Sequence, residues 1–396
     1  MKKKTLIAMT TMATIWTGAV AAESNVQLYG VIDAGVTHFT GLAPATGAAP
    51  GQTVSSTALS SGVQAADRIG LKGSEELGGG LSALFNVETG FCGVGLNQAE
   101  PTNGKSQQTF CTGGGFMQRT AVVGLVGDFG KVTAGRAFTT AFLNEDHIDP
   151  FGRGLTGDIG NLSIVGAFTK SALVRASQMV SYTTPTLSRF QGTATYSFAP
   201  GAGGTVPTAS GKGSLVERMW SLGGRYKSGP VLLGVDYLTL TNDIASTNPQ
   251  TGVNDGALKT WQLFGAYDLG VVRFSGIYEQ AKQDYSTGSD KFWLLGATVP
   301  VGQGAILLSY DENKDDVAAP SANAVPAGTA KQYAIGYTYA LSKQTNLYSS
   351  YAYLRNASAN AGQTGTAYAV DDSTDSFSGV IGQASSGFGI GIRHQF

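Results

Sequence analysis

The chain has 396 residues, including 56 glycines, 16 tyrosines and 18 phenylalanines, but only 13% of its residues are charged and its formal net charge is −1. Soluble domains contain about a quarter charged residues, so the composition argues against the two or three soluble domains that this length would otherwise suggest. Nothing in this charge balance suggests a nucleic-acid partner, which would require a basic face or stripe.

The first 22 residues have the pattern of an export signal. Lys2, Lys3 and Lys4 precede a short apolar stretch over residues 5–17, and small residues follow up to Ala22. The apolar stretch is shorter than the ~20 residues that a membrane-spanning helix needs, so we expect a cleaved signal peptide over 1–22. Removing three lysines from the 26 Lys+Arg leaves 23 against 27 Asp+Glu, a mildly acidic mature chain.

Residues 23–396 are predicted to form one all-β domain. Residues 81–91, 190–198 and 332–340 alternate between apolar side chains and small polar ones, mostly Ser, Thr, Gln and Gly. A soluble sandwich would instead show Lys, Glu and Asp on its outer face. No run of 18 apolar residues follows the signal, so a membrane protein of this kind has to be a closed barrel, in which every backbone group is paired. Short turns alternate with long Gly/Ser/Asn-rich connections, which predicts a transmembrane antiparallel β-barrel of about 16 strands.

The only two cysteines, Cys92 and Cys111, lie in one stretch rich in Gly, Asn, Gln and Thr. An exported protein meets an oxidising compartment, so we expect a disulfide that closes this loop, with two free thiols as the alternative. Two cysteines without a nearby histidine cannot complete a tetrahedral metal site. We expect no metal and no cofactor, although His147, close to several acidic residues, leaves a weak cation site open.

The last predicted strand, residues 388–396, ends on an aromatic residue. Phe388, Ile390, Ile392 and Phe396 share one face of this strand, and no tail follows. Chain termini are usually loose, so an ordered final strand is unusual for a soluble protein.

Several segments together resemble the general porins of Gram-negative bacteria, of the beta-proteobacterial (neisserial) type, and the similarity runs over the whole mature chain. The resemblance implies an outer-membrane channel, exported through the periplasm, for passive diffusion of small hydrophilic solutes and ions. It also implies a homotrimer, contact with outer-membrane lipid and lipopolysaccharide, and insertion by the barrel-assembly machinery through the strand that ends at Phe396. The segments are VQLYGVIDAG (26–35), RIGLKGSE (68–75), residues 119–125, FGKVTAGR (129–136) and IRHQF (392–396).

The resemblance further implies a long third loop, about residues 139–170, that folds into the bore and narrows it. Its acidic residues would face basic residues on the barrel wall. The acidic candidates are Glu145, Asp146 and Asp149, and the basic ones are Arg68, Lys72, Arg119, Arg136 and Arg175. An arginine at mid-membrane depth costs about 2–4 kcal/mol when it faces lipid, which independently favours an inward orientation. The alternatives are interface or loop positions for the arginines and a solvated loop face for the acids.

Three functions remain from different classes. The first is a general diffusion pore, the second a substrate-selective channel, and the third an adhesin or structural barrel that acts through its loops. An enzyme is not expected, because Ser210-Gly-Lys-Gly-Ser214 lacks the spacing of a phosphate loop and no nucleophile motif is present. The sign of any ion preference stays open, because the acidic net charge and the arginines point in opposite directions.

Overall fold

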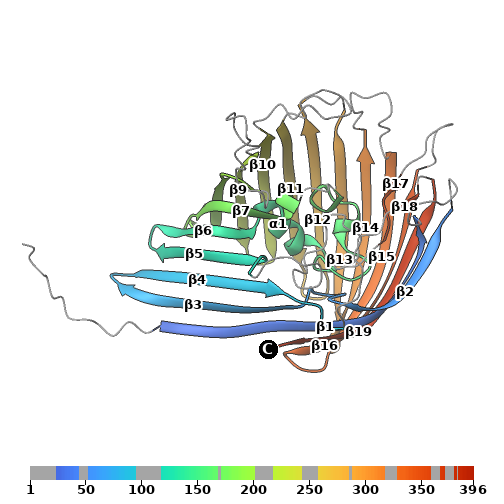
Figure 1. Ribbon diagram of the computed structural model, residues 1–396, viewed down its shortest axis with the longest axis horizontal. Helices are drawn as coiled ribbons and strands as arrows, with labels where there is room; N and C mark the ends of the chain where they lie inside the picture. Colours follow the sequence, from blue (N-terminus) through green and yellow to red (C-terminus); the bar gives the residue numbers. More distant parts are fainter. Residues whose placement is uncertain are drawn as a thin grey trace, which may run out of the picture.

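The computed structural model describes residues 24–43, 52–94, 117–167, 171–200, 217–242, 257–284, 288–316, 328–357, 366–370, 379–380 and 382–396. Within these residues, sixteen antiparallel strands form one closed barrel, which confirms the predicted fold class (Figure 1). The barrel strands are β1 (Ser24–Leu42), β3 (Arg68–Gly78), β4 (Leu81–Gly90), β5 (Thr120–Gly127), β6 (Gly130–Phe138), β7 (Arg175–Thr183), β8 (Phe190–Ser197), β9 (Glu217–Ser228), β10 (Val231–Asn242), β11 (Ala257–Asp268), β12 (Arg273–Gln283), β13 (Asp290–Val301), β14 (Gly304–Asp315), β15 (Gly328–Ala340), β16 (Thr345–Asn356) and β19 (Ala384–Gln395).

The barrel closes between its first and last strands. β1 pairs with β19 from Val31 opposite Gln395 to Thr40 opposite Ser386. Gly30 and Phe396 extend this ladder through two backbone hydrogen bonds, of 3.0 and 3.1 Å. The ring of Phe396 lies directly over Gly30, where a Cβ atom would collide with it. The last residue is therefore part of the closing seam.

The strand faces follow the alternation read from the sequence. On β15, Tyr333 and Ile335 are 52% and 53% exposed, whereas Gln332, which directly precedes Tyr333, is fully buried. Exposed apolar side chains recur on the outer rows around the barrel, while the inner rows combine polar side chains with buried apolar ones, such as Phe292 and Leu294 of β13. This is the pattern expected where lipid or a protein neighbour covers the outside and water fills the inside.

One end of the barrel carries tight turns and the other carries long connections. β5 ends at Gly127 and β6 begins at Gly130, and β13 and β14 are separated just as closely. At the other end, β2 (Val54–Ser61) pairs with the C-terminal half of β1, and β17 (Thr366–Ala367) pairs with β18 (Gly379–Val380).

The connection between β6 and β7 turns into the barrel. It contains the helices α1 (Thr140–Ile148), η1 (Ile159–Asn161), α2 (Ile164–Ala167) and α3 (Ser171–Val174). α1 packs against β10, β11 and β12, and α2 packs against β12 and β13 (Figure 1). We call residues 139–174 the inner loop. Among the described residues, none of the helices is long and apolar enough to cross a membrane.

Two predictions fall on other parts of the chain. The signal peptide over 1–22 lies outside the described residues. Cys92 follows β4 and is described, but Cys111 lies outside the described residues, so the disulfide between them stays a prediction.

Candidate functional site in the bore

The inner loop is fixed to the far wall of the barrel by hydrogen bonds along its length. Ser275 on β12 donates to the carbonyl oxygen of Ile148 at 2.7 Å. The hydroxyl of Thr156 donates to that of Ser350 on β16 at 2.9 Å, and the Asn161 amide donates to Gln332 on β15 at 2.9 Å. These contacts hold the loop against β12–β16 and leave the inner rows of β3 to β6, with Arg68, Lys72 and Lys131, on its other side.

Glu145 points into the loop and not into the bore. It is fully buried and lies 3.0 Å from the guanidinium of Arg153, which also contacts Asp158 at 3.4 Å. Burial raises the pKa of Glu145, and Arg153 opposes that shift. Burial opposes the charge on Arg153, but Asp158, Glu145 and Asp149 together hold the pKa of its guanidinium above its usual value. The structure therefore revises the prediction that Glu145 faces the bore, because its carboxylate is used to fold the loop.

Asp149 has a similar structural role. Its carboxylate accepts hydrogen bonds from the backbone N–H groups of Phe151, Arg153 and Ile159 at 3.0, 2.9 and 3.2 Å. Burial and the nearby Asp158 raise the pKa of Asp149 to about 8, even though the three N–H donors favour the charged form. Asp149 is buried, so it too differs from the prediction and shapes the turn after α1.

Asp146 is the exposed one of the three predicted loop acids. Burial of part of the side chain raises its pKa, and His147, Arg153 and Arg68 oppose that rise. The influence of Arg68 brings a residue of the opposite wall into the field of the loop. His147 beside it lies 2.6 Å from the carbonyl oxygen of Leu143. No group of three or more His, Cys, Asp or Glu in the described residues is arranged to hold a metal ion.

The opposite wall carries the accessible cations. Arg68 and Lys72 alternate on β3 with the outward Ile69 and Leu71, so both face inward. The Lys72 ammonium lies 5.1 Å from the ring centroid of Tyr29 on β1. The Arg68 side chain, 26% exposed, lies 3.5 Å from Glu88 on β4. The structure places these two residues on the inner row, and their part in a constriction stays a prediction.

Arg119 and Arg175 lie at the upper edge of the same wall but are buried. Arg119 forms an ion pair with Glu88 at 2.7 Å. The guanidinium of Arg175 lies 3.8 Å from the ring centroid of Phe138, which itself stacks on Phe142 of α1. Arg119 is therefore paired within the wall, Arg175 packs beside the ring through which β6 meets the inner loop, and both have little contact with water.

Arg136 is placed differently from the prediction. It lies opposite Ala121, which belongs to the outward row of Val123 and Leu125 on β5. Its guanidinium donates to the carbonyl oxygen of Gln118 and to the hydroxyl of Ser177 at 2.7 Å. The pairing of β6 with β7 shifts register next to it, between Gly135 and Ala137. The resemblance assigned Arg136 to the bore, whereas its parity with Ala134, which lies opposite the outward Val123, assigns it to the outward row.

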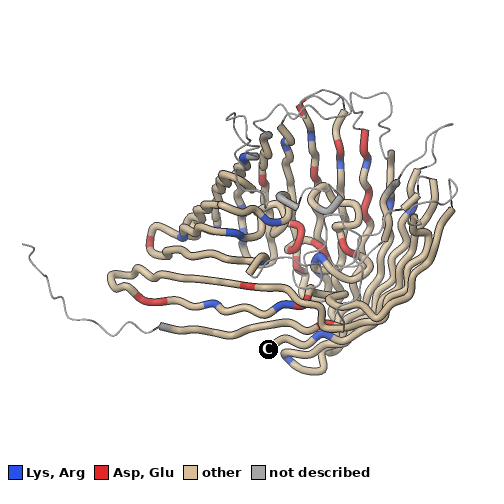
Figure 2. Tube along the Cα trace, in the orientation of Figure 1, with Lys and Arg blue, Asp and Glu red and all other residues tan. Residues whose placement is uncertain are grey.

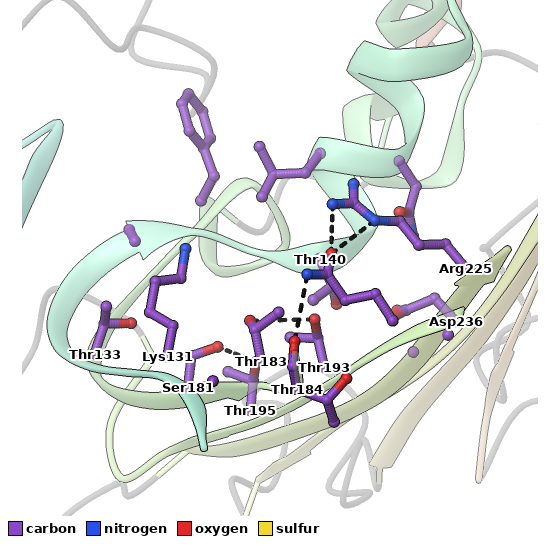
Figure 3. A pocket seen from close by; sticks show the side chains of 18 of the residues that line it. Lys131, Thr133, Thr140, Ser181, Thr183, Thr184, Thr193, Thr195, Arg225 and Asp236 are labelled. Carbon is purple, nitrogen blue, oxygen red and sulfur yellow. Dashed lines mark hydrogen bonds between the residues drawn. The ribbon is translucent and has the colours of Figure 1, made fainter. Parts of the chain in front are cut away.

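Toward the tight-turn end, a cavity of about 570 Å³ lies between α1 and the inner face of the wall. Lys131 of β6 and Arg225 of β9 stand on opposite sides of it, with a row of hydroxyls between them (Figure 3). The hydroxyls of Thr183 and Thr193 are 3.3 Å apart across β7 and β8, and Arg225 donates to Gln191. The cavity continues the water-filled bore below the inner loop.

Burial sorts the charges of the described residues by sign. The acidic side chains that face inward or belong to the inner loop are mostly buried, whereas Arg68, Lys72, Lys131 and Arg225 keep contact with the bore. The buried acids are Asp33, Asp67, Glu88, Glu145, Asp149, Asp158, Asp236, Glu279, Asp290 and Asp311, against the buried bases Arg119 and Arg175.

Sequence reasoning missed several members of this arrangement. Glu88, the carboxylate between Arg68 and Arg119, lies on the polar face of an alternating strand and could have been found by its parity. Lys131 and Arg225 occupy inward positions of β6 and β9 that the same parity would have identified. Arg153 carries no such signal, because its partners Glu145 and Asp158 meet it only once the inner loop has folded.

Comparisons with known proteins agree with this architecture. A family model described as Gram-negative porin matches residues 6–359. An outer membrane porin protein of Bordetella pertussis is 29% identical and outer membrane porin protein 32 of Delftia acidovorans is 30% identical, each over 100% of both chains. Among solved structures, an anion-selective porin from Comamonas acidovorans shows a TM-score of 0.71 at 26% identity, covering 94% of this chain and 100% of that chain.

The family match and the closed barrel with its inner loop lead to the same conclusion. They confirm the resemblance found in the sequence, the outer-membrane location and the function of a channel for passive diffusion of solutes. This chain belongs to the Gram-negative porin family, of the beta-proteobacterial type.

Proposed function

We propose that this porin is a diffusion channel that prefers anions. The observation that carries the proposal is the sorting of charge by burial: the cations Arg68, Lys72, Lys131 and Arg225 meet the bore, while most carboxylates around it are buried. Rings of charge at a narrow point set the ion preference of a pore, and buried carboxylates close to arginines contribute little to that field. The mildly acidic total charge of the mature chain is then a poor guide to selectivity.

The similarity to a porin described as anion-selective supports the same preference. The test is to insert the refolded protein into a planar bilayer and record the zero-current potential under a tenfold KCl gradient. A potential of the sign set by chloride flux supports the proposal, and one set by potassium flux refutes it. Insertion without conductance would instead favour the adhesin or structural barrel.

A substrate-selective channel is the second candidate, favoured by the cavity between Lys131 and Arg225. Its row of hydroxyls could hydrogen-bond a small hydrophilic anion whose charge the two cations attract. Current that is blocked saturably by one class of solute would support this function over general diffusion. Flux of several small anions that rises linearly with concentration would exclude it.

We further propose that the chain assembles as a homotrimer through β1 and β3–β5. The outward rows of these strands are mostly aliphatic, as in Val26, Leu28, Val123 and Leu125, and they include Glu75, Phe85 and His38 but no Lys or Arg among their described positions. One structural neighbour is described as a trimer form of an outer membrane protein. Such a smooth apolar face suits packing against a second copy.

The remaining proposals concern assembly and processing. The place of Phe396 in the closing seam supports its role in recognition by the barrel-assembly machinery. The N-terminal pattern supports cleavage after Ala22, which the mass of the mature protein would test. A mass measured with and without reduction and alkylation would test the disulfide between Cys92 and Cys111. The channel role requires no catalysis and no cofactor.

A further inference from the structure

Six basic side chains form a belt on the outside of the barrel. On β11, Lys259 shares its face with the partly buried Trp261 and the exposed Leu263, whereas Leu258 and Thr260 on the other face are buried. The same alternation turns one basic residue outward on each of the five following strands. The outer belt consists of Lys259, Lys282, Lys291, Lys314, Lys331 and Arg355, on β11 to β16.

The belt lies at the end of the barrel that carries the long connections. Figure 2 shows basic positions near this end of neighbouring strands. The tight turns, such as the one between Val301 and Gly304, lie at the opposite end. In outer-membrane barrels the tight turns face the periplasm and the longer loops face the outside. The belt therefore lies at the level of the outer leaflet.

A row of paired aromatic rings fixes the depth of the belt. Trp261 packs against Tyr278 with ring centroids 5.1 Å apart, and Trp293 packs against Tyr310 at 5.0 Å. Tyr310 in turn packs against Tyr333, with ring centroids 4.9 Å apart. Aromatic belts mark the interface between membrane and water. Lys259, Lys291 and Lys331 each stand two positions beyond one of these rings, which is about 7 Å along a strand. This depth is that of lipid headgroups.

The belt residues face each other as like-charged pairs. Lys259 is directly opposite Lys282, Lys291 is opposite Lys314, and Lys331 is opposite Arg355. Like charges in directly opposed positions destabilise a sheet. An arrangement repeated three times therefore calls for an anion between the members of each pair.

Carboxylates of the protein pair with only three of the six cations. One cation of each pair has an acidic partner: Lys259 with Asp284 at 2.6 Å, Lys314 with Asp316 at 3.1 Å, and Lys331 with Glu312 at 3.5 Å. The other three, Lys282, Lys291 and Arg355, form no ion pair within the described part of the chain. Each pair thus keeps one spare positive charge at headgroup depth.

The belt is also one-sided. The outward rows of β1 and β3–β5, which we assign to subunit contact, carry no Lys or Arg among their described residues. In a trimer built through β1 and β3–β5, the belt on β11 to β16 faces lipid. We propose that the outer belt binds the phosphate groups of lipid A, the lipid anchor of lipopolysaccharide, with Lys282, Lys291 and Arg355 supplying the free charge. This proposal rests on the outer-membrane location and on the subunit contact proposed above, and not on the anion preference of the bore.

The test measures binding of diphosphorylated lipid A to the purified protein in detergent by native mass spectrometry. Each cation near an anionic surface contributes about a fivefold gain in affinity, so K282Q/K291Q/R355Q is expected to bind on the order of a hundredfold more weakly. The matched control R189Q/K227Q/K343Q removes three cations near the tight-turn end and is expected to bind as the wild type does. All variants are expected to keep the wild-type single-channel conductance and ion preference, because the belt lies outside the bore.

A second variant tests the proposal in the opposite direction. Glu312→Gln frees Lys331 and is expected to tighten lipid A binding about fivefold. It keeps the proposal testable if the triple variant fails to fold. Binding that is unchanged in both variants, or that is equally strong for dephosphorylated lipid A, would overturn the proposal. Displacement of the lipid by an equal concentration of inorganic phosphate would also overturn it, since the belt would then be a site for free anions.

Discussion

Charged side chains on the two sides of the bore differ in their exposure to water. On the β3 side, Arg68 and Lys72 stand on an inner row next to water. On the β12–β16 side, Glu145, Asp149 and Asp158 fold inward around Arg153 and are covered by the inner loop. The contrast shows that the field in a pore follows from which charges remain exposed, and not from how many residues of each sign the sequence contains.

Replacing Arg153, the cation among the buried acids, is expected to have the largest effect on the protein. Arg153→Met leaves Glu145 and Asp158 buried without a partner, which typically destabilises by about 3–5 kcal/mol. We expect a lower melting temperature and a noisy, fluctuating channel conductance, because the inner loop loses its internal ion pairs. Arg153→Lys retains the charge and should behave much more like the wild type. A Met variant with normal melting and a steady current would show that these ion pairs do not hold the loop.

Removing charge from the exposed side should change selectivity without harming the fold. Arg68→Gln combined with Lys72→Gln is expected to lower the chloride-to-potassium permeability ratio by roughly two- to fivefold, since both cations face the bore. The zero-current potential in a KCl gradient measures this ratio. Lys282→Gln combined with Lys291→Gln removes the same charge from the outer face and should leave it unchanged. Equal shifts in both double variants would mean that total charge, and not its position, sets the preference.

A smaller effect should appear in the pH dependence of stability. Because the pKa of Asp149 is raised to about 8 in the folded protein, its neutral form is favoured by folding. The resulting stabilisation is complete below about pH 4 and is lost as the pH rises through about 8. Between pH 5 and pH 9 we expect the wild type to lose roughly 1–3 kcal/mol more unfolding free energy than Asp149→Asn, which cannot ionise. Parallel pH profiles of melting for the two proteins would contradict the assigned shift.

The sequence predicted the barrel well because strand alternation is a local property. The rows of residues 81–91 and 332–340 appear in β4 and β15 with the expected faces, and the parity of Arg68 and Lys72 was correct. The inner loop was predicted from family resemblance, since no local pattern requires a loop to fold into a bore.

The failures arose where distant contacts decide the outcome. Glu145 and Asp149 look like exposed loop acids, but their burial depends on wall residues such as Ser275, Gln332 and Ser350, far away along the chain. Arg136 was assigned to the bore by family resemblance, whereas its parity with Ala134 on β6 places it on the outward row. The burial of the two acids leaves no mark in the adjacent sequence, but the row of Arg136 can be read from it.

The most direct test compares two neighbouring carboxylates on α1, the exposed Asp146 and the buried Glu145. The measurement is the zero-current potential of Asp146→Asn and of Glu145→Gln in the same KCl gradient. If exposure determines the field, Asp146→Asn raises the preference for chloride, while Glu145→Gln leaves the potential at its wild-type value. Equal shifts in the two variants, or a shift in Glu145→Gln alone, would contradict the claim that burial removes the acidic side from the field of the bore.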